Sequence, residues 1–165
     1  MYVFSERHKV VNAIIPVADA FSANVTSDIV HLENYKKCTF LIVTGATSTD
    51  AGLVTVGAGA TSTGAATAIP FKYRTQIAAA PPNAGSDVSS TLIDATSTGF
   101  AMTASKAGGL YIVEVDAAVV AAATAGYDHV ALTVTEVGST GVTACVLAIL
   151  SEPRYPQDIL VTAID

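Results

Sequence analysis

The chain has 165 residues, only 13% of them charged, and a formal net charge of −6. Proteins that bind nucleic acid through its phosphates cluster lysine and arginine, whereas the 8 such residues here are scattered, so we expect no nucleic-acid partner. The longest apolar run, residues 117–123, is far shorter than the roughly 18 residues of a membrane-spanning helix, so we expect no membrane partner either.

The first 19 residues mix charged, aromatic and apolar side chains without a clear period. The charged stretch from Glu6 to Lys9 precedes a short apolar segment that Pro16 interrupts, which is not the pattern of a secretory signal. We therefore expect residues 1–19 to form an extended N-terminal arm that becomes ordered against a partner, and residues 20–165 to form a single domain.

Short runs of β-forming residues follow the arm, separated by turn signals about every ten residues. The runs are residues 25–32, 37–44, 52–58, 67–75, 91–93, 99–104, 110–116, 127–136 and 142–150. Runs of this length and spacing are typical of an all-β domain, so we expect an antiparallel β-sandwich of the jelly-roll type.

The connections between these runs also carry a pattern, because the tetrapeptide Ala-Thr-Ser-Thr occurs three times and predicts hairpin loops. Its copies occupy residues 46–49, 60–63 and 95–98. Residues 78–90 contain adjacent prolines and predict an irregular loop. One short helix is predicted over residues 116–124, with Asp116 as its N-cap and Gly126 as its stop.

Alternation of apolar and charged residues indicates which strand faces are buried. In residues 69–74 and 110–116 we expect the apolar side chains to point inward and the charged ones outward. The inward residues are Ile69, Phe71, Tyr73, Tyr111, Val113 and Val115, and the outward ones are Lys72, Arg74, Glu114 and Asp116. Pro70 restricts the start of its strand to a sheet edge or a bulge.

Residues 40–43 and 145–150 are apolar on both faces of their strands. An antiparallel sandwich tolerates such strands when a second layer or another subunit covers their outer side. This is the sequence evidence for a homo-oligomer. The candidate residues for the interface between copies are Phe40, Ile42, Leu147 and Ile149.

A catalytic group is conceivable but is not the favoured interpretation. Glu114 and Asp116 share a strand face, and Asp128 and His129 lie near them if the intervening connection is compact, which would supply an acid/base pair. Ordinary exposed residues explain all four more simply. We therefore expect no enzymatic activity and no cofactor.

Metal ligands are not predicted either. His8, His31 and His129 are too dispersed in the sequence for a His-x-His metal motif. Cys38 and Cys145 each lie in an apolar, strand-like run without ligand neighbours, so we expect both to be buried free thiols.

Several segments, most of them in the C-terminal third, resemble the small auxiliary head proteins of tailed bacteriophages. They are residues 68–74, 111–118, 126–132, 135–136 and 147–155. The resemblance implies a capsid decoration, or cement, protein. Such a subunit is rich in β-strands, binds the outer surface of the major capsid protein shell, commonly as a trimer, and stabilises the virion from the exterior of the capsid.

For that role, the N-terminal arm and an extended C-terminal segment are the expected shell contacts. The candidate contact residues are Tyr2, Phe4, Arg7, Lys9, Arg154 and Tyr155. Two other classes remain open. One is another phage structural or adhesion component, such as a tail tube, a fibre or a carbohydrate-binding module, and the other is a jelly-roll enzyme.

Overall fold

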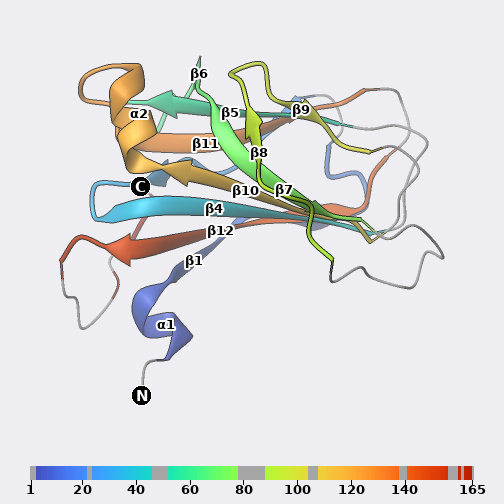
Figure 1. Cartoon of the computed structure of the whole chain (residues 1–165), viewed down its shortest axis with the longest axis horizontal. Helices are drawn as coiled ribbons and strands as arrows, with labels where there is room; N and C mark the ends of the chain where they lie inside the picture. Colours follow the sequence, from blue (N-terminus) through green and yellow to red (C-terminus); the bar gives the residue numbers. More distant parts are fainter. Residues whose placement is uncertain are drawn as a thin grey trace.

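The computed structural model describes residues 3–21, 24–45, 52–77, 88–103, 108–137, 141–155, 160 and 162–164. Two antiparallel sheets pack against each other in this part of the chain (Figure 1). The first sheet has the order β1 (Lys9–Val17), β12 (Ala144–Pro153), β4 (Tyr35–Thr44), β10 (Leu110–Asp116), β7 (Phe71–Gln76), β8 (Ile93–Ala95). The expected all-β sandwich is confirmed.

The second sheet has the order β2 (Asn24–Thr26), β11 (His129–Thr135), β5 (Leu53–Gly59), β6 (Thr67–Ala68). Two further short strands join it, because β3 (Val30–His31) pairs with β11 and β9 (Phe100–Ala101) pairs with β5. Eight main strands can be lettered B to I in chain order: β1, β2, β4, β5, β6, β10, β11 and β12. The first sheet then has the order B-I-D-G, extended by β7 and β8, and the second has the order C-H-E-F. That order is a jelly roll.

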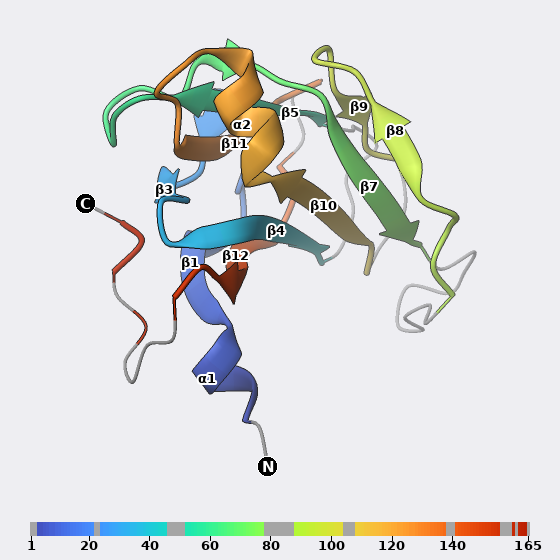
Figure 2. The same cartoon turned by 60° about the vertical axis from the view of Figure 1, so that its left-hand side comes forward.

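The N-terminal region departs from the prediction. Residues 9–17 are not an arm outside the domain: they form β1, which pairs antiparallel with β12 and buries Val11, Ala13 and Ile14. Within the predicted arm, the helix α1 (Phe4–Arg7) is the part that projects from the sandwich (Figure 2). The pairing register shifts between Asn12 and Ile14, and this bulge breaks the two-residue period that would have revealed the strand.

The run predicted as one strand over residues 67–75 forms two strands in different sheets. Its first part, β6, pairs with β5 in the second sheet, and its second part, β7, pairs with β10 in the first sheet. The chain crosses between the sheets at Ile69 and Pro70, where the Ile69 N–H still donates to the Val56 carbonyl at 3.0 Å. Pro70 permits the crossing because it has no N–H to contribute to a ladder.

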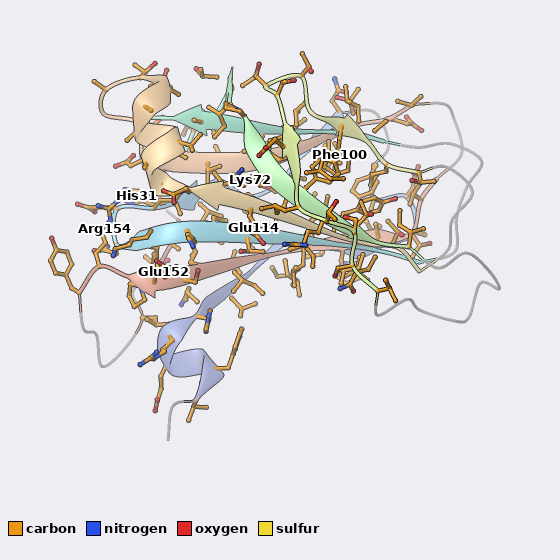
Figure 3. All side chains as sticks on the ribbon, viewed as in Figure 1. His31, Lys72, Phe100, Glu114, Glu152 and Arg154 are labelled. Atoms are coloured by element: carbon orange, nitrogen blue, oxygen red, sulfur yellow. The ribbon has the colours of Figure 1, made fainter. Side chains whose placement is uncertain are left out.

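The core lies between the two sheets and follows the expected alternation. In β10, Tyr111, Val113 and Val115 are buried, whereas Glu114 and Asp116 are exposed. Aromatic rings fill one part of this core: Tyr73 stacks on Phe100 with ring centroids 3.9 Å apart, and Phe71 and Tyr111 pack against the same ring (Figure 3).

The helix α2 (Ala117–Ala123) follows β10 and contacts strands of both sheets at one end of the sandwich (Figure 1). As predicted, the Asp116 side chain caps it by accepting from the Ala118 N–H at 2.7 Å. Gly126, with φ of 87°, turns the chain into β11 after the helix. Val120 is fully buried and anchors the helix to the core.

Among the Ala-Thr-Ser-Thr loops, the copy at 60–63 lies in a turn between the paired strands β5 and β6, as expected of a hairpin. The copy at 95–98 connects β8 of the first sheet to β9 of the second, so its prediction as a hairpin is wrong. The copy at 46–49 and most of the predicted loop at 78–90 lie outside the described residues.

Candidate functional site

The outer face of the first sheet carries two rows of apolar side chains across its central strands. In one row Leu41 of β4 pairs with Leu147 of β12 on one side and Ile112 of β10 on the other. In the next row Val43 pairs with Cys145 and Leu110. These side chains point away from the core and stay partly or largely exposed.

The edge strand β1 extends the same apolar surface. Val10 pairs with Ile149, and the bulge in β1 turns Ile14 into the core while Ile15 faces solvent. Val10 and Ile15 are 46% and 65% exposed. We call the surface formed by residues 10, 15, 41, 43, 110, 112, 145, 147 and 149 the outer apolar face.

The four residues predicted at an interface separate into two groups. Leu147 and Ile149 lie on the outer apolar face. Phe40 and Ile42 are 0% exposed, because they point between the sheets, so their assignment to a subunit surface is wrong. The outward residues of that strand are Leu41 and Val43. The two-residue alternation of side chains along a strand predicts this once the bulky Phe40 is placed in the core.

Charged residues border the outer apolar face at the α2 end. One cross-strand row runs from Ile149 through Thr39 and Glu114 to Lys72, which forms an ion pair with Asp94 of β8 (Figure 3). These charges carry both signs, so this border has no strong field of either sign.

Lys37, on the next row, forms an ion pair with Glu152 at 3.0 Å. The hydrogen bond to the Glu152 carboxylate, reinforced by its charge, raises the pKa of Lys37 above its ordinary value. Both side chains are about half exposed, so the pair contributes little to stability and mainly fixes how the two side chains lie.

A hollow of about 490 Å³ separates α1 from the end of β12. Its lining comes from residues 7, 8 and 151–155, so the two chain segments predicted as separate shell contacts meet in this hollow. Arg7, Arg154 and Tyr155 all line it. Two arginines and an exposed tyrosine ring in one concave surface suit recognition of an acidic or polar protein loop.

The remaining contact candidates flank this hollow. Phe4 is exposed and stacks on His8, the residue after α1, with ring centroids 4.3 Å apart. Lys9 begins β1. Tyr2 lies outside the described residues. A backbone hydrogen bond fixes the side of the hollow that the end of β12 forms, since the Arg154 N–H donates to the Asn34 carbonyl at 2.9 Å.

Glu152 has a backbone conformation that L residues seldom adopt, with φ of 54°. A non-glycine residue in this left-handed region costs of order 1 kcal/mol or more of conformational free energy, and such residues cluster at active and binding sites. Here it turns the end of β12 at the wall of the hollow, next to Arg154 (Figure 3).

The conceivable acid/base residues are distributed over two places. Glu114 and Asp116 line a smaller hollow of about 230 Å³ together with Lys37 and Lys72. Asp128 instead forms its hydrogen bonds with histidines.

His31 and His129 come into direct contact, although they lie 98 positions apart in the sequence. Pairing of β3 with β11 sets them opposite each other, and their rings stack with centroids 4.3 Å apart. The Asp128 carboxylate accepts from His31 Nε2 at 3.0 Å and from His129 Nδ1 at 2.5 Å. Burial raises the pKa of Asp128, but these two hydrogen bonds outweigh burial and hold the pKa below its ordinary value.

Both cysteines are free thiols, as predicted. Cys38 is fully buried in the core, and this burial raises the pKa of its thiol. Cys145 is only partly buried, because it belongs to the outer apolar face. The prediction that both thiols are buried is therefore correct for Cys38 alone.

Comparison with models of protein families, with curated proteins and with solved structures finds no match for this chain. Within the part of the chain that the structure describes, no helix has the length and apolar character needed to cross a membrane.

Proposed function

We propose that this protein is a capsid decoration protein of a tailed bacteriophage, which binds the outer surface of the major capsid protein shell and stabilises it. The observation that carries the proposal is the outer apolar face, a broad apolar surface on one side of a jelly roll. Monomeric proteins seldom leave large contiguous apolar patches in water, and such patches commonly mark interaction sites.

In this proposal one surface mediates self-association and another binds the shell. The outer apolar face joins copies of the chain, most simply as a homotrimer, and the hollow lined by Arg7, Arg154 and Tyr155 contacts the shell. Charge supports the division, since the apolar rows suit a permanent interface and the arginines suit a polar surface. Repetition of modest contacts over an oligomer and over many lattice sites would give tight attachment through avidity.

The main alternative in the same setting is a module that binds carbohydrate. Such modules usually present exposed aromatic rings as platforms for sugars. Here four of the aromatic residues, Phe71, Tyr73, Phe100 and Tyr111, pack into one internal cluster. Their position favours a structural role for the aromatic residues over a glycan site.

The test is a pelleting assay with expanded, undecorated capsids that contain the cognate major capsid protein. We expect the purified chain to co-sediment with the shell, to saturate at a fixed ratio to the capsid protein and to raise the temperature at which the shell ruptures. Stabilisation follows because a ligand that binds only the assembled shell shifts the equilibrium toward it. Failure of the native chain to bind its cognate shell overturns the proposal.

Two variants separate the proposed surfaces. Arg154→Glu should reduce shell binding without changing the oligomer, because the side chain lines the hollow and is not part of the outer apolar face. Leu147→Asp should dissociate the oligomer and thereby lose avidity. Thr26→Asp, which adds the same charge to an exposed position of the second sheet, is the control and should change neither property.

A further inference from the structure

The cluster of His31, Asp128 and His129 plays no part in the proposed assembly surfaces. It lies where β3 pairs with β11 at one end of the sandwich, and Figure 3 marks His31 there. One ligand atom from each of the three residues lies within 4.8 Å of the other two. Two imidazoles and a carboxylate are a donor set that zinc and its neighbours among the divalent transition metals prefer.

We propose that His31, Asp128 and His129 form a binding site for a divalent transition metal, with Zn²⁺ as the best-matched ion. A tetrahedral zinc ion with bonds of about 2.0–2.1 Å holds its ligand atoms roughly 3.3 Å apart. The imidazole nitrogens now lie 3.0 and 2.5 Å from the carboxylate oxygens, so a small outward movement of Asp128 makes room for the ion.

The backbone places all three residues before any ion arrives. The Leu32 N–H donates to the Asp128 carbonyl at 2.7 Å, and the Asp128 N–H donates to the Gly59 carbonyl at 3.1 Å. His129 is 5% exposed and fixed in the sheet, so it acts as the anchor. The His31 and Asp128 side chains are 23% and 40% exposed and supply the movement.

Metal binding requires the two rings to leave their parallel stack, because the lone pairs of stacked imidazoles do not converge on one point. His31, the more exposed ring, tilts so that Nε2 points at the same position as His129 Nδ1. Each of these nitrogens now donates an N–H hydrogen bond to Asp128. On metal binding the proton moves, by exchange through water, to the other nitrogen of the same ring, which frees a lone pair for the ion and keeps the imidazole neutral.

A fourth ligand is within reach. A carboxylate oxygen of Glu33 lies 3.9 Å from His31 Nε2, and its exposed side chain can turn inward. Two histidines and two carboxylates would close the coordination shell, which is the form of a structural site. The backbone N–H of His31 also donates to the Ala163 carbonyl at 2.9 Å. An ion that joins β3 to β11 would therefore also help to hold the C-terminal segment against β3.

The experiment is calorimetric titration of the full chain, without a histidine tag, with ZnCl₂. We expect one zinc ion to bind per chain, the melting temperature to rise with zinc concentration, and MgCl₂ to have no such effect because Mg²⁺ prefers oxygen ligands. NMR should show the ring protons of His31 and His129 shifting as the stack opens.

His31→Ala and Asp128→Asn should each weaken zinc binding at least ~10-fold. Asp128→Asn keeps a hydrogen-bonding side chain of the same shape, so it tests binding even if the alanine variant folds poorly. His8→Ala removes a histidine outside the cluster and should bind zinc like the native chain. Absence of zinc binding by the native chain, or equal binding by the Asp128→Asn variant, overturns the proposal.

Discussion

The outer faces of the two sheets differ in whether the chain itself covers them. On the second sheet, a Cβ atom added to Gly57 would lie 1.9 Å from the Ala65 carbonyl oxygen, and one added to Gly59 would lie 1.6 Å from the Gly64 carbonyl oxygen. The loop between β5 and β6 therefore packs directly on this strand. On the first sheet, by contrast, the outer apolar face remains exposed.

We infer from this difference that a partner would cover the first sheet and not the second. The second sheet gains its cover from its own chain, and its uncovered positions include hydroxyl-bearing residues such as Thr26 and Thr133, which bond to each other at 2.9 Å. The first sheet places leucine, isoleucine and valine at equivalent outward positions. Its cover, we infer, comes from another copy of the chain.

The largest expected effect contrasts the two sides of one strand. Phe40→Ala should lower the free energy of unfolding by about 3–5 kcal/mol, because the ring is fully buried between the sheets. Leu41→Ala should cost about 1 kcal/mol or less in the monomer, since this side chain is already partly exposed. Urea unfolding at protein concentrations low enough to dissociate any oligomer measures the free energy of unfolding of both variants. Equal losses of stability would refute the assignment of Phe40 and Leu41 to opposite faces.

The N-terminal boundary gives the next effect. Deleting residues 1–8 should leave the stability of the sandwich nearly unchanged, since α1 buries no residue. Deleting residues 1–11 should cost about 2 kcal/mol, because it removes the buried Val11 and its pairing with β12. Thermal unfolding of the two truncated chains compares them directly, and equal stability would mean that β1 is not part of the folded sheet.

An effect of similar size tests the cover of the second sheet. Gly59→Ala should destabilise the chain by about 1–3 kcal/mol, because the new methyl group collides with the backbone of the loop. The control is Gly64→Ala in the same loop, where the nearest atom to an added Cβ lies 3.9 Å away, so no loss is expected. Equal unfolding midpoints for the two variants would show that the loop does not pack on β5.

Local pattern predicted the sandwich, the faces of β10 and the capped helix α2, because each depends on neighbours in the sequence. It missed β1, since the bulge near Ile14 removes the two-residue period. It also merged β6 with β7, because apolar residues keep alternating while the chain crosses between sheets at Pro70.

The sites were harder to predict than the strands, because pairing between distant strands creates them. His31 meets His129 only through the register of β3 with β11, and no local spacing records that register. The hollow beside α1 likewise depends on β1 pairing with β12, which brings Arg7 near Arg154. The contact residues were named individually from the sequence, but their common surface was not.

The central claim is that the outer apolar face joins copies of this chain, and the solution mass tests it most directly. Light scattering on the native protein should give a multiple of the 16.8 kDa chain mass, with three copies expected, and Leu147→Asp should reduce the mass to that of one folded chain. Circular dichroism confirms that the variant stays folded. A native mass of 16.8 kDa at micromolar concentration would contradict the claim.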